Sequence, residues 1–159
     1  LKMTRQEVRD ELKDSEGRPE VKGQIRKMQR QLSEQRMMDA VPTADVVITN
    51  PTHFAVALRY DEHGLGAPKV VAKGQDFMAA RIREIAADHN ITIFEAPSLA
   101  RALYGMVELN REIPASLYKA VAQILAYVFQ LKDPSKVRPQ KPTAPGYFDV
   151  PEQYRGETV

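Results

Sequence analysis

Two segments rich in Val, Ile, Ala and Leu flank a turn of only four residues. Asp45–Thr49 and Phe54–Tyr60 have the composition of β-strands, and between them stands Asn50-Pro51-Thr52-His53. We expect the two strands to pair, or at least to lie side by side, in one sheet. A tight turn clamped between buried strands is a place where a chain can store backbone strain.

The turn sequence predicts one unusual reaction. The common attack on an asparagine side chain comes from the next backbone N–H, which Pro51 lacks. The reverse attack stays open: the Asn50 side-chain nitrogen adds to its own backbone carbonyl, closes a succinimide and expels the Pro51 nitrogen. His53 is placed to serve as the base, and the Thr52 N–H or hydroxyl to stabilise the oxyanion. The alternative is an inert Asn-Pro turn, which is common in loops.

The remaining periodicity predicts a small α/β domain. Short apolar segments alternate with amphipathic ones, so we expect a central sheet of about four strands surrounded by helices. The further strands are expected at 69–72 and 91–94. The further helices are expected at 76–88, from an N-cap at Ser98 to about 107, and from Pro114 to about 132.

Residues 1–40 are polar and charged, and we expect a long N-terminal linker helix that Gly17-Arg18-Pro19 interrupts. Between residues 21 and 36, five basic side chains accompany one acidic side chain and an apolar stripe at helical spacing. This stripe consists of Val21, Ile25, Met28 and Leu32. The segment is either a solvated helix face or a contact for anionic lipid or for a protein partner.

Composition excludes several classes of protein. The chain has no cysteine, and its three histidines (His53, His63 and His89) lack the spacing of metal ligands, so we expect no metal and no cofactor. The net charge of +2 gives weak support for nucleic-acid binding, and we expect none. Residues 133–159 contain five prolines and few aliphatic side chains, which predicts a flexible Pro-rich C-terminal tail.

Several stretches of this chain resemble the cytoplasmic domain of the FlhB/YscU family of type III export switch proteins. The resemblance covers residues 1–132, and its Ala67–Gly74 stretch is closer to the flagellar branch than to the injectisome branch. The stretches that carry it are Val21–Gly23, Met37-Met38, Ala44–His53, Ala67–Gly74, Leu99–Tyr104 and Ile113–Ala126.

This resemblance implies a fold, a reaction and a set of partners. It implies an α/β domain at 41–132 that cleaves itself once between Asn50 and Pro51, without turnover on other substrates, with Thr52 and His53 assisting. The pieces 1–50 and 51–159 would stay associated, and cleavage would switch export from rod and hook proteins to filament proteins. The implied partners are the membrane subunits of the export apparatus, a hook-length control protein and the export substrates.

The resemblance also implies that the parent protein is anchored in the plasma membrane. The chain begins at Leu1 rather than at a methionine, and we expect it to be the cytoplasmic fragment of that longer protein. Two alternatives remain open, which are the equivalent switch protein of a virulence injectisome and an adaptor that does not cleave. A hydrolase acting on other molecules has no supporting constellation of residues, although widely spaced triads leave no pattern in sequence.

Overall fold

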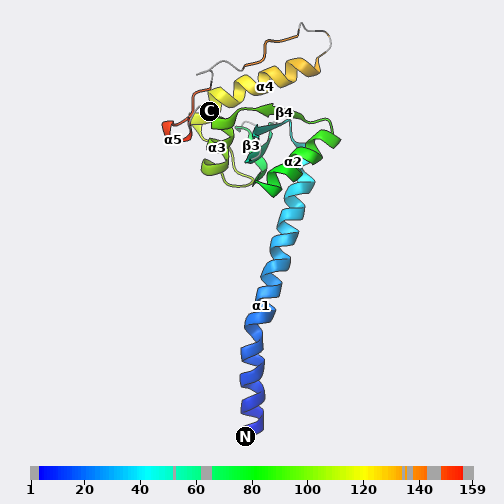
Figure 1. The fold of residues 1–159 in the computed structure, drawn as a ribbon, viewed down its shortest axis with the longest axis vertical. Coiled ribbons are helices and arrows are strands. Elements are labelled where there is room, and N and C mark those ends of the chain that lie inside the picture. Colours follow the sequence, from blue (N-terminus) through cyan, green and yellow to red (C-terminus); the bar gives the residue numbers. More distant parts are fainter. Residues whose placement is uncertain are drawn as a thin grey trace. The chain divides into compact units, whose positions relative to one another are not determined.

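The computed structural model describes residues 4–51, 53–61, 66–133, 135, 138–142 and 148–155. The chain divides into two compact units, residues 1–36 and 37–159. Its elements are α1 (Arg5–Ala40), the 3-10 turn η1 (Val41–Thr43), β1 (Val46–Asn50), β2 (Phe54–Arg59), β3 (Lys69–Gln75), α2 (Phe77–Asp88), β4 (Thr92–Glu95), α3 (Pro97–Met106), η2 (Ala115–Leu117), α4 (Tyr118–Lys132) and α5 (Glu152–Arg155) (Figure 1).

Helix α1 is continuous, and the interruption predicted at Gly17-Arg18-Pro19 is wrong. Pro19 lies inside the helix, where its ring removes one backbone hydrogen bond. The surrounding Glu, Lys, Arg and Gln residues are good helix formers. The apolar stripe of α1 is 48% to 61% exposed at Ile25, Val21, Leu32 and Met28. Among the described helices, none is both long and apolar enough to cross a lipid bilayer.

The described strands form one sheet in the order β3-β2-β1-β4. Strands β1 and β2 pair antiparallel in the register Val46↔Leu58 through Asn50↔Phe54, and β3 continues antiparallel beside β2. Strand β4 pairs parallel with β1 from the other side. The strand that precedes the Asn-Pro turn is therefore an interior strand of the sheet.

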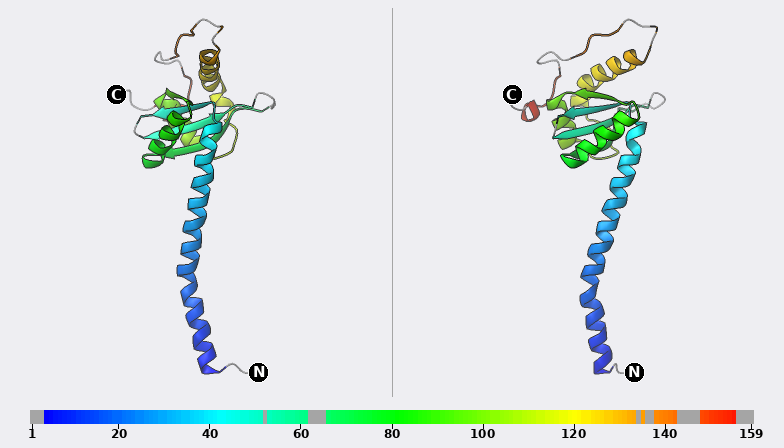
Figure 2. Two further views of the ribbon diagram at one scale, coloured as in Figure 1. Left: turned by 90° about the vertical axis from the view of Figure 1, so that its right-hand side faces the viewer. Right: turned by 45° about the vertical axis from the view of Figure 1, so that its right-hand side comes forward.

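Each face of the sheet has its own apolar layer. Side chains of β1 alternate between the faces, so that Val46 and Ile48 pack toward α3 and α4 while Val47 packs toward α2. Figure 2 shows α4 and α2 on opposite sides of the strands. Met38 and Val41, which lead into β1, join the α2 layer. The predicted small α/β domain is confirmed.

Two predicted helix starts need correction. Helix α3 begins at Pro97, and its N-cap position is Ala96, so Ser98 lies within the first turn. Proline at the first helical position has no N–H to leave unsatisfied, which sets the start one residue earlier. Likewise Pro114 opens the short turn η2, and α4 follows from Tyr118.

Part of the expected flexible tail is ordered. Val150 is only 2% exposed, and α5 packs on α3. In Figure 1 α5 lies beside α3 at the edge of the domain. The composition of residues 133–159 did not indicate this contact because its partners are distant in sequence.

Candidate functional site

The turn between β1 and β2 brings the predicted reactive residues together. Asn50 ends β1 and pairs with Phe54, the first residue of β2. The His53 N–H donates to the Asn50 carbonyl oxygen at 3.0 Å, which closes a four-residue turn with Pro51 in its second position. Proline is favoured there because its fixed φ suits the turn. Thr52 lies outside the described residues.

The Asn50 carbonyl is the group that succinimide closure would attack. Its oxygen already accepts the hydrogen bond from His53 N–H. A donor at this position stabilises negative charge as it develops on the oxygen. The sequence predicted this role for Thr52, which lies outside the described residues, and the structure adds a donor from the backbone of His53.

The base of the turn is held on both sides. Thr49, the residue before Asn50, is 3% exposed, and its carbonyl accepts the Ala96 N–H at 2.9 Å. On its other side Thr49 pairs with Ala55 of β2. Asn50 is half-buried, whereas Pro51 and His53 are exposed. The electrophilic carbonyl is therefore anchored in the sheet while the turn beyond it is open to water.

Asp76 contacts His53 through both its backbone and its side chain. Its N–H donates to the His53 carbonyl at 2.9 Å, and its Oδ1 lies 4.0 Å from His53 Nδ1. The Asp76 and His53 side chains are 73% and 65% exposed, so this contact between them is weak. Asp76 has φ 49°, a conformation that L side chains rarely adopt. The junction of β3 and α2 is thus strained where it touches the turn.

Helix α3 contacts the far side of the turn through aromatic rings. The Phe54 and Tyr104 ring centroids are 4.7 Å apart. The Lys73 ammonium lies 5.0 Å from the Tyr104 ring and donates to the carbonyls of Tyr104 and Val107 at 3.0 and 2.9 Å. These carbonyls end α3, so one cation satisfies the helix terminus beside the turn.

With this geometry in place, comparison with known proteins identifies the family. A sequence model of the FlhB HrpN YscU SpaS family matches residues 1–128. The chain belongs to this family. The resemblance predicted from the Asn-Pro turn and its neighbouring motifs is confirmed.

The flagellar members of the family are close relatives. The chain is 55% identical over 152 residues to the flagellar biosynthetic protein FlhB of Salmonella typhimurium, and 49% identical over 132 residues to that of Bacillus subtilis. These matches cover 96% and 83% of the chain but only 40% and 37% of the relatives. The chain therefore spans about two fifths of the length of the curated FlhB proteins that it matches.

Solved structures of the family share the fold. The cytoplasmic domain of FlhB from Shewanella putrefaciens matches with a TM-score of 0.67 and 47% identity, covering 76% of this chain and 94% of that one. A mutated C-terminal domain of EscU matches with a TM-score of 0.56 and 27% identity, covering 58% of this chain and 98% of that one. The FlhB-type α/β architecture is thus shared with the EscU domain.

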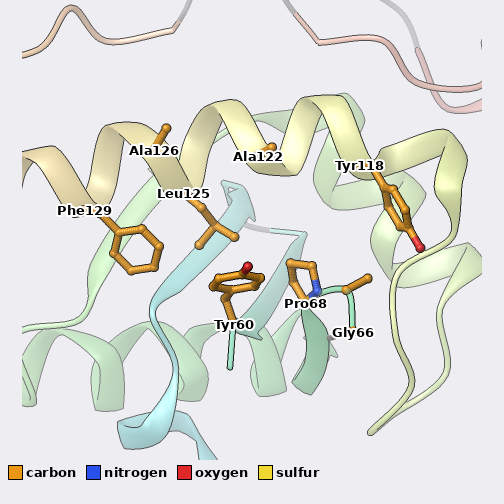
Figure 3. A pocket seen from close by; sticks show the side chains of 9 residues that line it. Tyr60, Gly66, Pro68, Tyr118, Ala122, Leu125, Ala126 and Phe129 are labelled. Carbon is orange, nitrogen blue, oxygen red and sulfur yellow. The ribbon is translucent and has the colours of Figure 1, made fainter. Parts of the chain in front are cut away.

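A second feature of this FlhB-family domain is an apolar groove beside α4. The groove has a volume of about 500 Å³. Figure 3 shows the Phe129 ring at one end of it, Tyr118 at the other, and Tyr60 and Pro68 between them. Its lining residues are Tyr60, Gly66, Ala67, Pro68, Tyr118, Ala122, Leu125, Ala126 and Phe129. An apolar concavity of this size is typical of a binding site.

Sequence reasoning missed Asp76, Lys73 and Tyr104 as neighbours of the turn. All three are brought there by pairing of β2 with β3 and by packing of α3. The sequence placed Asp76 at the start of the expected helix 76–88, and nothing in that position indicated its contact with the turn. Across the described residues, no cluster of three or more His, Asp or Glu side chains could hold a metal ion.

Proposed function

We propose that this chain is the cytoplasmic part of a flagellar type III export protein and that it cleaves itself between Asn50 and Pro51. The observation that carries the proposal is the turn in which His53 N–H donates to the Asn50 carbonyl oxygen. Cleavage would begin with attack on the carbon of this carbonyl. Membership of the FlhB family and the flagellar names of the relatives at 55% identity support it.

The proposed reaction is intramolecular: one C–N bond forms, one C–N bond breaks, and one proton moves from the attacking nitrogen to the leaving nitrogen. Asn50 Nδ2 attacks the Asn50 backbone carbon, and the tetrahedral oxygen keeps its hydrogen bond from His53 N–H. The bond from that carbon to the Pro51 nitrogen breaks, and the proton lost by Nδ2 reaches the leaving Pro51 nitrogen. His53 is the side chain that we propose carries this proton. Water later opens the succinimide at Asn50, and no cofactor takes part.

The reaction turns over once for each chain. The product keeps Asn50 at the end of one fragment and Pro51 at the start of the other, so no catalyst is regenerated. We therefore propose a self-processing switch rather than an enzyme that acts on other molecules. Cleavage frees the turn from its β1 end, and we propose that this release switches export from rod and hook proteins to filament proteins.

The proposed partners are the membrane subunits of the export apparatus, a hook-length control protein and the export substrates. We propose that the parent protein is anchored in the plasma membrane and that this part lies in the cytoplasm.

The apolar groove beside α4 supports a docking role, because it fits a short apolar segment of a substrate. Ala122→Arg should narrow the groove and weaken substrate binding in a pull-down, without changing self-cleavage.

Intact mass under denaturing conditions tests the cleavage directly. We expect two fragments, residues 1–50 and 51–159, from the wild type and a single full-length species from Asn50→Ala. Asn90→Ala, which replaces an exposed asparagine after α2, should still cleave. First-order kinetics independent of protein concentration would separate self-cleavage from action on another chain.

The alternatives give different outcomes. An intact wild-type chain that remains stable for days would favour the non-cleaving adaptor. A cleaved chain whose full-length parent protein fails to restore motility in a strain lacking its own flagellar switch protein would favour the injectisome branch. Asn50→Ala that cleaves at the wild-type rate would overturn the proposed chemistry.

A further inference from the structure

The C-terminal segment Phe148–Arg155 is bound to α3 through a single arginine. The Arg101 guanidinium donates from Nε and Nη2 to the Tyr154 carbonyl, both at 3.2 Å, and from Nη2 to the Arg155 carbonyl at 3.2 Å. These carbonyls are at the C-terminal end of α5, where no intrahelical donor is available. The Arg101 side chain of α3 therefore binds the C-terminal end of α5.

Apolar side chains of the segment are inserted beside the same helix. Val150 is 2% exposed and belongs to the core layer that contains α3, α4 and Phe94. The Phe148 ring meets Phe94 of β4 edge to face, with centroids 6.0 Å apart. The Tyr154 ring lies against Gly105, where an added Cβ would come within 2.9 Å of a ring carbon. The α3 surface thus has a space that only glycine leaves open for this ring.

The segment also holds its own shape. Arg155 Nε donates to the Val150 carbonyl at 2.9 Å, and Arg155 Nη2 lies 3.2 Å from the Asp149 carboxylate. The Tyr154 N–H donates to the Pro151 carbonyl at 2.9 Å. A segment that is already folded loses less conformational entropy when it binds. It has the properties of a preorganised peptide ligand.

We propose that α3 and β4 form a peptide-binding surface and that residues 148–155 of the same chain occupy it as an exchangeable ligand. The ligand chemistry is an aromatic side chain, a Val-Pro pair and one helical turn that ends in Tyr-Arg. One buried valine, two ring contacts and one guanidinium make a small contact. The covalent link to the rest of the chain compensates for this small contact. A short linker gives the segment an effective concentration at the surface on the order of millimolar.

This inference goes beyond the proposed function, since it does not depend on cleavage at Asn50. The surface is nevertheless close to the turn along α3. Gly105 contacts the tail, and its neighbour Tyr104 contacts Phe54 at the start of β2. A protein that presents the same chemistry has to displace the tail before it binds beside the turn.

The test uses the full chain with Asn50→Ala, so that cleavage plays no part. Val150→Asp is added to release the tail while the α3 surface stays intact. The probe is a fluorescein-labelled peptide of residues 148–155 with blocked termini, followed by fluorescence anisotropy. We expect the Val150→Asp chain to bind the peptide at least about ten-fold more tightly than the chain with the native tail, whose own segment competes.

Surface variants in the Val150→Asp chain provide the matched controls. Arg101→Met removes the guanidinium and Gly105→Leu fills the space for the tyrosine ring, so each should weaken binding at least about ten-fold. Arg111→Met, an exposed arginine in the segment beside β3, should bind as before. Thermal unfolding of each variant verifies that the domain is intact.

The opposite results would overturn the inference. Equal peptide binding by the chains with and without Val150→Asp means that the tail does not compete. Absence of binding to a folded Val150→Asp chain means that no peptide-binding surface exists. Unchanged binding after both Arg101→Met and Gly105→Leu means that the peptide binds elsewhere.

Discussion

His53 contributes two groups to the turn, and they are separable. Its backbone N–H donates to the Asn50 carbonyl, while its imidazole faces Asp76 across 4.0 Å. A side-chain substitution removes only the second group. The backbone hydrogen bond to the developing oxyanion would then persist, so part of the self-cleavage rate should remain.

His53→Ala should slow self-cleavage roughly 10²-fold without abolishing it, because a positioned base contributes on that order. Mass spectrometry of samples withdrawn over time measures the rate. Added imidazole should restore part of it, since a free base can replace the missing side chain. His89→Ala is the control, because His89 contacts the carbonyl of Ile85 at the end of α2 instead of the turn. A wild-type rate in His53→Ala would remove the imidazole from the mechanism.

Asp76 adopts φ 49°, and this strain predicts a stabilising substitution. Asp76→Gly should raise the unfolding free energy by about 1 kcal/mol, because glycine adopts positive φ without steric cost. Thermal denaturation of a non-cleaving background measures it. Gln75→Gly, one residue earlier in β3, should instead destabilise the domain. Equal destabilisation by both glycines would show that Asp76 is not strained.

At the scale of elements, Lys73 connects β3 to the end of α3. Lys73→Met should cost about 2 kcal/mol, because two carbonyls lose a charged donor in a half-buried position. That loss should lower the melting temperature by roughly 8 °C for a domain of this size. Lys69→Met, an exposed lysine at the start of the same strand, is the matched control. Similar melting temperatures for the two variants would contradict this role of Lys73.

The elements also show what sequence could predict. Strand and helix periodicity is local, so the turn between β1 and β2 and most element positions followed from the sequence. Asp76, Tyr104 and the tail contact of Arg101 depend on pairing between β2 and β3 or on packing of α3. Such contacts join residues that are 23 to 54 positions apart, and no short window of the sequence contains both partners.

At the scale of the whole domain, cleavage would leave β1 between two strands of the other fragment. β1 pairs with β2 on one side and with β4 on the other. Its Val46, Val47 and Ile48 side chains are fully buried. Burial of three such side chains contributes on the order of 5–9 kcal/mol, an upper estimate, to association of the fragments.

We therefore expect fragments 1–50 and 51–159 to elute together at micromolar concentration on native size-exclusion chromatography. Ile48→Val removes one buried methylene at the centre of β1 and should cost about 1 kcal/mol, which is roughly a five-fold faster release of fragment 1–50. Ile93→Val on β4 is the control, because Ile93 is partly exposed. Fragments that separate in the wild type would show that β1 is not retained. In that case the cleaved domain would have to work with an open position between β2 and β4.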